Sequence, residues 1–266
     1  SAETGWARGT VTQRLNELLE TGWLVEDEPA GTRPERRGRP STTYQLNPRG
    51  ALVFVLALGQ TQATVALTDM GGRPLTGRLI VFSPGREAKD ANDTAKQARA
   101  LLDASLREAG RCNDEVQLCV VGKPGPIDPK DPGAPTAMPG WLDVDIRDTV
   151  EVVLGVRTVI ENDVNLMVLG YWDTNGRPDG SIVMVKAALG MGAGIILDGQ
   201  LVRGRRGMAG EIGHLPVSVS SSELCACGHA NCVGNAVGTT YVLRSLREQG
   251  VDVTTVSDLN DCVGRG

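Results

Sequence analysis

The sequence predicts an α/β fold that is preceded by a small module of one helix and two strands. Apolar residues recur at helical spacing between residues 10 and 21, and two short strand-like runs follow. From residue 51 onward, short β-type runs alternate with segments of helical length, which is typical of α/β layering. The longest apolar run, Ala51–Leu58, is strand-sized and far below the roughly 18 residues of a membrane span. The sequence therefore predicts no membrane helix.

The composition is ordinary for a globular protein. The chain has 266 residues, of which 41% are hydrophobic and 22% charged, and this length suggests more than one folding unit. A net charge of −5 excludes a protein that coats nucleic acid indiscriminately, although a small DNA-reading module with local positive charge remains possible. Three of the six cysteines crowd into Cys225–Cys232, unlike a disulfide framework, so we expect a reducing cytoplasm.

The helix predicted at Thr10–Thr21 has an apolar stripe and a polar face. Thr10 and Gln13 are spaced as a capping box, and Gly22 suits a left-handed stop. The stripe consists of Val11, Leu15, Leu18 and Leu19. The polar face and its flanks carry Thr12, Gln13, Arg14, Asn16 and Glu17. Gln and Asn side chains can bond adenine edges in the major groove, and Arg8 and Arg14 are placed to meet phosphates.

A basic loop separates the two strands predicted at residues 23–25 and 42–46. It contains Arg33, Arg36, Arg37 and Arg39 against Glu35. The narrow Gly38-Arg39-Pro40 turn can carry an arginine into a minor groove. Helix, strand, basic loop and strand is the order of a recognition helix and a wing. A protein-binding helical hairpin with a solvated basic loop is the alternative.

The body of the chain alternates strands and helices. The predicted strands are residues 53–59, 63–68, 75–82, 116–121, 156–160 and 181–186. The predicted helices are residues 91–108, 146–154 and 163–172. Four motifs lie between these elements: the Gly- and Pro-rich turn 122–128, Glu161-Asn162-Asp163 at a strand-to-helix junction, the glycine-rich turn 189–196, and Gly210-Glu211-Ile212-Gly213-His214. Each is weak alone, because glycine turns are usually plain turns and Asn-Asp pairs are usually helix caps.

In this order and spacing, the motifs resemble those of the ROK (repressor, open reading frame, kinase) family of sugar kinases and repressors, from about Thr10 to Val233. The resemblance implies an actin-like (ribonuclease H-like) body of two lobes around a cleft, and the preceding winged helix-turn-helix indicates the repressor branch. The expected domains are a partial winged helix-turn-helix at 1–48, an N-terminal lobe at 49–161 and a C-terminal lobe with a zinc loop at 162–266. Such a winged helix needs helices before the recognition helix, and the family's second lobe ends in further helices. The chain is therefore expected to be truncated.

The cysteine cluster predicts a metal site. Cys225-x-Cys227-x4-Cys232 offers three soft ligands, and either His214 or His229 can supply a fourth. The resemblance favours His214, because Glu-x-Gly-His is the family pattern, and it implies a structural zinc ion. Four protein ligands leave no open position for a reactive water. The remaining cysteines, Cys112, Cys119 and Cys262, are expected to pack as small hydrophobes.

The resemblance also assigns the cleft. Asp163 stands at the position of the catalytic base, and Asn162, Glu211 and His214 stand where the family contacts sugar hydroxyls.

Other positions depart from the family pattern. Ala57 stands where the kinases carry an aspartate and Gln60 where they carry a glycine, whereas Ala188 and Leu189 replace a glycine and a threonine. Each lost electrostatic contact costs ~10²–10³ in rate, so we expect no enzyme activity and a vestigial base. On the sugar side, Ala137 and Gly234 replace an asparagine and a glutamate, which leaves the effector open.

These observations predict a sequence-specific DNA-binding transcriptional regulator, most simply a repressor. Its partners would be palindromic double-stranded operator DNA, a sugar or sugar-phosphate effector, and further copies of itself in a homodimer or homotetramer. The alternatives are an ATP-dependent hexose kinase with an N-terminal extension and a regulator whose cleft binds nothing.

Overall fold

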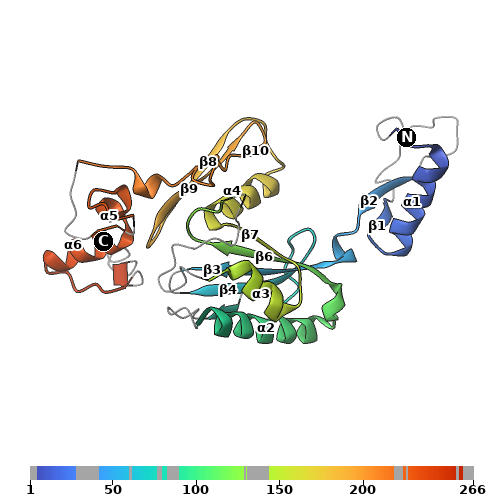
Figure 1. Cartoon of the computed structure of the whole chain (residues 1–266), viewed down its shortest axis with the longest axis horizontal. Coiled ribbons are helices and arrows are strands. Elements are labelled where there is room, and N and C mark those ends of the chain that lie inside the picture. Colours follow the sequence, from blue (N-terminus) through green and yellow to red (C-terminus); the bar gives the residue numbers. More distant parts are fainter. Residues whose placement is uncertain are drawn as a thin grey trace.

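A five-stranded mixed sheet forms the centre of the molecule in the computed structural model (Figure 1). The structure describes residues 5–27, 42–59, 62–76, 80–82, 90–128, 130, 144–218, 224–225, 227–255 and 258–259. The strand order is β5-β4-β3-β6-β7, with β3 (Leu52–Leu58), β4 (Ala63–Asp69), β5 (Ile80–Phe82), β6 (Val116–Lys123) and β7 (Thr158–Asn162). The β3–β6 and β6–β7 pairs are parallel, and β4 and β5 continue the sheet antiparallel. The carboxyl ends of β3, β6 and β7 therefore meet at one edge.

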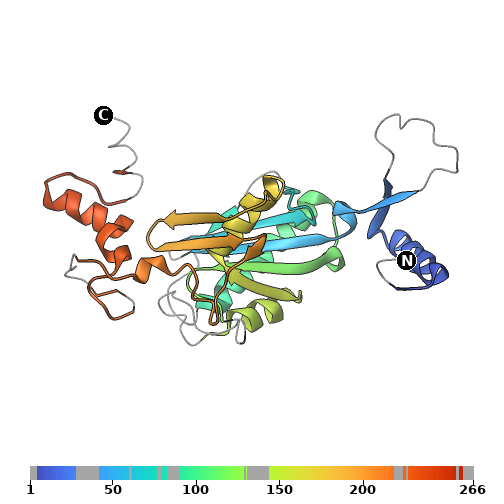
Figure 2. The ribbon, with the colours of Figure 1, turned by 90° about the horizontal axis from the view of Figure 1, so that it is seen from above.

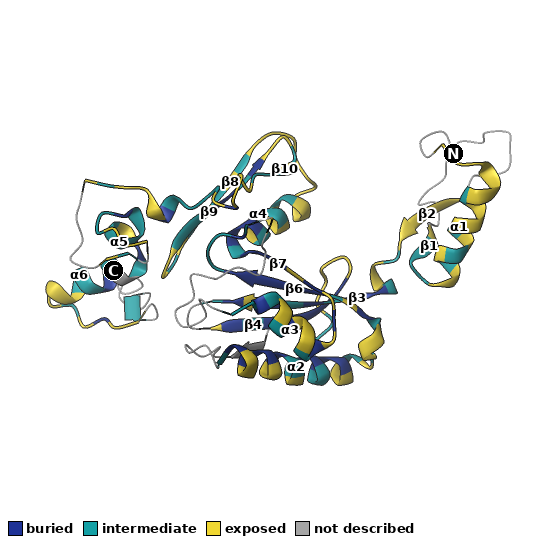
Figure 3. Cartoon of the chain, viewed as in Figure 1, coloured by how far each residue is buried: buried dark blue, intermediate teal, exposed yellow. Residues whose placement is uncertain are grey.

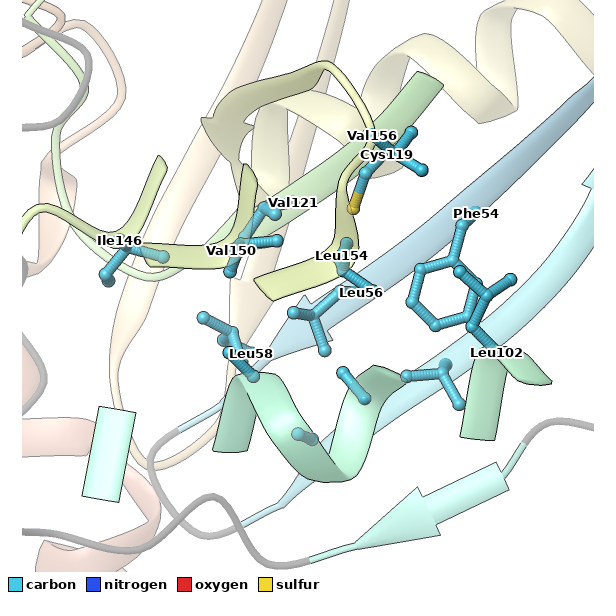
Figure 4. Packing of buried hydrophobic residues seen from close by; sticks show 14 of the residues in the cluster. Phe54, Leu56, Leu58, Leu102, Cys119, Val121, Ile146, Val150, Leu154 and Val156 are labelled. Atoms are coloured by element: carbon cyan, nitrogen blue, oxygen red, sulfur yellow. The ribbon is translucent and has the colours of Figure 1, made fainter. Parts of the chain in front are cut away.

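Helices α2 (Asp90–Ala109) and α3 (Ile146–Leu154) cover one face of this sheet (Figure 1). Alternate residues of β3 point into the core, where Phe54 and Leu56 pack with Leu102 of α2 and Leu154 of α3 (Figure 4). All four side chains have 0% exposure, and each such burial stabilises the fold by about 1.5–3 kcal/mol. This apolar core fixes the positions of the strand ends.

The opposite face carries α4 (Asp163–Thr174), which also packs on a second, three-stranded sheet. The order of that sheet is β10-β9-β8, with β8 (Ile182–Ala187), β9 (Met191–Leu197) and β10 (Gln200–Leu201) all antiparallel. Gly194 permits the contact, because a Cβ there would lie 2.5 Å from the Val164 carbonyl oxygen. The single-turn helix η3 (Ile212–His214) follows, with α5 (Val233–Val237) and α6 (Thr239–Glu248) at the far end of the molecule (Figure 2).

The N-terminal module extends from the other end of the body (Figures 1 and 2). It contains α1 (Arg8–Glu20) and an antiparallel pair, β1 (Leu24–Asp27) and β2 (Thr43–Leu46), joined to β3 by η1 (Pro48–Gly50). Gly22 has φ +76°, as predicted for the helix stop. The predicted capping box is wrong, because the helix begins two residues earlier at Arg8, Thr10 is its third residue, and Ala7 caps it without a side-chain bond.

The apolar stripe of α1 is only partly covered (Figure 3). Val11, Leu15 and Leu19 are half-buried, whereas Leu18 is 41% exposed, and no residue of α1 is buried. The predicted helix and hairpin are thus confirmed as elements. Their membership of a winged helix-turn-helix remains a proposal.

Most predicted elements of the body are confirmed, with local differences. Within the predicted strand at 75–82, Leu75 and Thr76 form a bend that follows an isolated bridge between Thr68 and Pro74, and Ile80–Phe82 pairs with β4. Cys119 is buried as predicted, but Cys112 is exposed beside η2 (Asn113–Glu115), so its predicted burial is wrong. Cys262 lies outside the described residues. Within the ranges described above, no helix is long and apolar enough to cross a membrane.

Candidate functional site

The site begins where the parallel strands end. Gly122 on β6 lies opposite Ala57 of β3 and Glu161 of β7 in the strand register. A Cβ at Gly122 would lie 4.0 Å from the Cα of Ala57 and 3.9 Å from the Cα of Asp163. Ala57 and Asp163 thus flank one glycine, on the sheet face that carries α4.

Asn162 holds the start of α4. Its Oδ1 accepts from the backbone N–H groups of Val164 (2.9 Å) and Asn165 (3.0 Å), and its Nδ2 donates to the Gly125 carbonyl (3.0 Å). An asparagine cap of this kind is worth ~1 kcal/mol. Asn162 therefore ties the Gly- and Pro-rich turn to the helix, and its contact with a sugar hydroxyl stays a prediction.

Asp163 forms an ion pair that the sequence did not predict. Its Oδ1 accepts from Val164 N (2.9 Å), and its Oδ2 lies 2.5 Å from Nζ of Lys186 on β8. Lys186 interrupts the otherwise apolar strand sequence Ile182-Val-Met-Val-Lys-Ala187, and this was the signal that could have found it. The carboxylate at the base position is consequently neutralised by an adjacent cation.

A second unpredicted ion pair stabilises the same junction. The Glu161 side chain is 10% exposed, and Arg203 donates to it from Nε and Nη2, each at 2.7 Å. Its other oxygen accepts from Asn165 Nδ2 and from Asn162 N, both at 2.9 Å. Because the Arg203 side chain is 45% exposed, solvent weakens the ion pair, and the two bonds from Asn165 and Asn162 make Glu161 a positioning group for the α4 start.

Glu211 and Lys123 complete a charged cluster, by which we mean Asp163, Lys186, Glu211, His214 and Lys123. Burial raises the pKa of Glu211, His214 opposes that shift, Asp163 adds to it, and Lys123 opposes it. Lys123 is 1% exposed, and burial lowers its pKa to about 8 although Glu211 favours its charge. Lys123, like Lys186, was not predicted.

Gly210 brings Glu211 to this place. It has φ +90°, and a Cβ there would lie 1.8 Å from the Ala193 carbonyl oxygen. The Gly210 carbonyl accepts from the Ala193 N–H at 2.7 Å. Only glycine allows this contact, which holds the loop against β9.

His214 and three cysteines form a candidate metal centre. Their ligand atoms all lie within 4.8 Å of one another. His214 Nδ1 is 3.2 Å from Cys225 Sγ, and Cys227 Sγ is 3.4 Å from Cys232 Sγ. Tetrahedral zinc with bonds of ~2.0–2.3 Å separates its ligands by roughly 3.3–3.8 Å, so this donor set fits zinc.

The geometry favours His214 over His229 as the fourth donor. His229 Nδ1 lies 3.6 Å from Cys227 Sγ, but His229 does not belong to the group of mutually close donors among the described residues. The other ring nitrogen of His214, Nε2, lies 3.8 Å from Glu211 Oε2. The imidazole therefore lies between the metal centre and the charged cluster, at an ion-pair distance from Glu211 that is longer than a hydrogen bond.

The predicted DNA-reading residues on α1 are all exposed. They are Arg8, Thr12, Gln13, Arg14 and Asn16. Gln13 Nε2 and Arg14 Nη1 donate to Glu17 at 3.0 and 2.6 Å. Arg37 and Arg39, like Gln60 and Ala137, lie outside the described residues. Gly234 is described, and a Cβ there would lie 3.2 Å from the Gly213 carbonyl oxygen.

Known proteins resemble the chain in sequence and in fold. The xylose repressor of Caldicellulosiruptor bescii is 27% identical over 259 residues, covering 94% of this chain and 62% of the repressor. The glucokinase of Thermotoga maritima is 32% identical over 196 residues, covering 72% of this chain and 58% of the glucokinase. The crystal structure of a ROK family transcriptional regulator, a homologue of the E. coli MLC protein, matches with a TM-score of 0.75 at 20% identity, covering 100% of this chain and 68% of that one.

The chain spans about three fifths of the length of the xylose repressor that it matches. The sequence profile of the ROK family matches residues 54–260, which include both sheets, the charged cluster and the cysteine cluster. This match confirms the family resemblance inferred from the motifs, and the chain belongs to the ROK family.

Proposed function

We propose that the chain is part of a transcriptional repressor that binds operator DNA through its N-terminal module and senses a sugar or sugar derivative at the charged cluster. One observation carries this proposal. The match to the xylose repressor covers 94% of the chain, whereas the match to the glucokinase covers 72%. A repressor, unlike a kinase, needs a DNA-binding segment in addition to the sugar-kinase-like body.

In this proposal α1 is the recognition helix of a winged helix-turn-helix, and the β1–β2 hairpin with Arg37 and Arg39 is its wing. The half-buried side of α1 faces the hairpin, and its polar side is left for a major groove. Gln13 and Arg14 are bonded to Glu17 in the free protein. Such exposed pairs contribute little to stability, so DNA can displace them at little cost.

The regulator would act in the cytoplasm as a homodimer or homotetramer on a palindromic operator, because two-fold symmetric modules read symmetric half-sites. Its domains would be 1–48, 49–161 and 162–266, the last boundary falling at the junction of β7 and α4. A structural zinc ion held by His214, Cys225, Cys227 and Cys232 would fix the loop beside Glu211. An effector would release DNA by binding one arrangement of the lobes more tightly than the other.

Substitutions in the module test DNA binding. We expect Gln13→Ala to weaken binding to the promoter DNA of the gene by roughly 5- to 100-fold and to relax base preference, because a bidentate base contact is worth ~1–3 kcal/mol. Arg39→Ala should weaken binding to all sequences and lower the salt slope by about 1. Fluorescence anisotropy of the full-length protein with promoter and unrelated duplexes, at two salt concentrations, measures both effects.

Gln117→Ala and Arg107→Ala are matched controls, because both residues are exposed on the body of the chain. They should leave the affinity unchanged. If the Gln13 and Arg39 substitutions also leave the affinity for the promoter unchanged, the assignment of α1 and the hairpin as the DNA-binding surface is contradicted.

An ATP-dependent hexose kinase is the second candidate function. Asp163 and the 32% identity to a glucokinase favour it. A coupled assay of ADP release with magnesium-ATP and hexoses tests this function.

A further inference from the structure

We infer that the charged cluster binds an anionic ligand, a sugar that carries a carboxylate or a phosphate, through Lys186 and Lys123. This inference rests on the proposed effector site and names the chemical class of its ligand. Lys123 lies at the end of β6 in the five-stranded sheet, and Lys186 lies on β8, an edge strand of the three-stranded sheet.

Lys186 is the accessible cation of the pair. Its side chain is 34% exposed, and its Nζ bonds Asp163 Oδ2 at 2.5 Å. Because a lysine ammonium is a compact charge on a flexible stem, it can pivot from Asp163 to an incoming anion. That exchange frees Asp163 to accept a hydrogen bond from a neighbouring hydroxyl of the same ligand. A ligand with an anionic group beside a hydroxyl therefore satisfies both residues.

Lys123 is the buried cation. An ammonium has three donors, yet among the described residues its Nζ makes one hydrogen bond, a long one of 3.5 Å to the Pro126 carbonyl. Burial of a charge that is so poorly bonded is unfavourable, and Glu211 provides the nearby opposite charge. Because the side chain is 1% exposed, Lys123 would favour a bound anion through its charge and not through a direct contact. Lys123 thus carries an unfavourable feature that a binding role explains.

The charge balance distinguishes this cluster from a site built for neutral sugars. Arg203 is already bonded to Glu161, which leaves Asp163 and Glu211 against Lys123 and Lys186. Each carboxylate is thus compensated by a lysine. A neutral sugar would need only the carboxylates and the His214 ring as hydroxyl partners and would make no use of the two ammonium groups. An anion replaces Asp163 as the partner of the accessible Lys186 through charge-assisted hydrogen bonds, which are the stronger kind.

Calorimetry of the full-length protein with matched ligands tests the inference. The probes are glucose against glucuronate and glucose 6-phosphate, galactose against galacturonate, and inorganic phosphate alone. We expect at least one acidic sugar to bind about tenfold or more tightly than its neutral parent. Lys186→Met should reduce this preference to within roughly threefold, because the neutral contacts remain.

Lys123→Met provides a test that unfolding cannot mimic. Because the pKa of Lys123 is lowered to about 8, the fold penalises its charged form, and this penalty is present at neutral pH and is relieved as pH rises from about 8 to the unfolded value. The methionine variant should therefore melt at a higher temperature than the parent and yet lose the preference for acidic sugars. Lys96→Met, at an exposed lysine of α2, should change neither property.

Equal or tighter binding of neutral sugars overturns the inference, as does an acidic preference that survives both lysine substitutions. Inorganic phosphate that binds as tightly as the acidic sugars overturns the sugar component. If no probe binds, the inference of an anionic ligand is also overturned. The proposed regulatory function is tested separately, by the measurement of promoter binding.

Discussion

Removal of zinc from the purified protein is expected to lower its melting temperature by about 10 °C. A ligand at ~1,000 times its Kd stabilises the folded state by about 4 kcal/mol. In a protein of this size each kcal/mol shifts the melting temperature by roughly 2–4 °C. The four donors bring together η3 and a loop more than ten residues further along the chain, and the isolated bridge between Pro216 and Cys232 is the one strand-like pairing described there. Two backbone hydrogen bonds, from Val217 N to the Asn231 carbonyl and from Val233 N to the Leu215 carbonyl, also join these segments, and the ion would add four bonds to them.

Single substitutions separate the ligands from the other cysteines and histidines. Cys225→Ser and His214→Ala should each lower the bound zinc and the melting temperature, because a tetrahedral site tolerates the loss of a ligand poorly. Cys112→Ser and His229→Ala are the controls, since Cys112 is exposed outside the centre and His229 is not among the mutually close donors. Zinc content is measured by atomic emission and stability by calorimetry. Zinc retained by His214→Ala but lost from His229→Ala would reverse the ligand assignment.

Local sequence signals predicted most of the fold. The α3 helix has its predicted bounds, and the structure shows why: Asp145 accepts from Asp148 N at its start and Gly155 ends it at φ +65°. The β7–α4 junction was found because Asn162 is a strong cap between two apolar segments. Two errors are local: α1 begins before its Thr10 candidate cap, and Leu75, expected to start a strand, lies in a bend.

The site was predicted less completely than the fold. The spacing of the cysteine cluster predicted a metal site, whereas the role of Asp163 was assigned by the resemblance to the ROK family. Lys186 meets Asp163 across 23 residues and Arg203 meets Glu161 across 42, and the sequence contains no signal for which cation approaches which carboxylate. Lys123 lies within the Gly- and Pro-rich turn 122–128, and no sequence signal indicated that its side chain is buried beside Glu211. Partners of this kind depend on how β8 and the 203–211 loop pack on α4.

The second large effect expected is the near absence of sugar kinase turnover. Hexose kinases typically run at ~1–100 s⁻¹, and loss of two transition-state contacts at ~10²–10³ each leaves roughly 10⁻² s⁻¹ or less. Ala57 and Asp163 flank Gly122. Ala57 stands where the kinases carry an aspartate, and its methyl side chain provides no carboxylate for hydrated magnesium. Leu189, 40% exposed in the turn before β9, has no hydroxyl for a phosphate. A coupled assay of ADP release with magnesium-ATP and a panel of hexoses measures the rate.

Lys186 adds a third obstacle to turnover, because its ammonium lies 2.5 Å from Asp163 Oδ2 and occupies an oxygen that a sugar hydroxyl would have to reach. We therefore expect Ala57→Asp with Leu189→Thr to raise the rate only partially, and the further change Lys186→Thr to raise it again. Asp163→Asn in that triple variant is the control, since it should remove whatever activity was gained. Turnover of about 1 s⁻¹ by the unaltered protein, abolished by Asp163→Asn, would instead establish a working kinase. In that case the body of the chain would be an enzyme, and the N-terminal module would need a role other than DNA binding controlled by an inactive sugar-kinase-like domain.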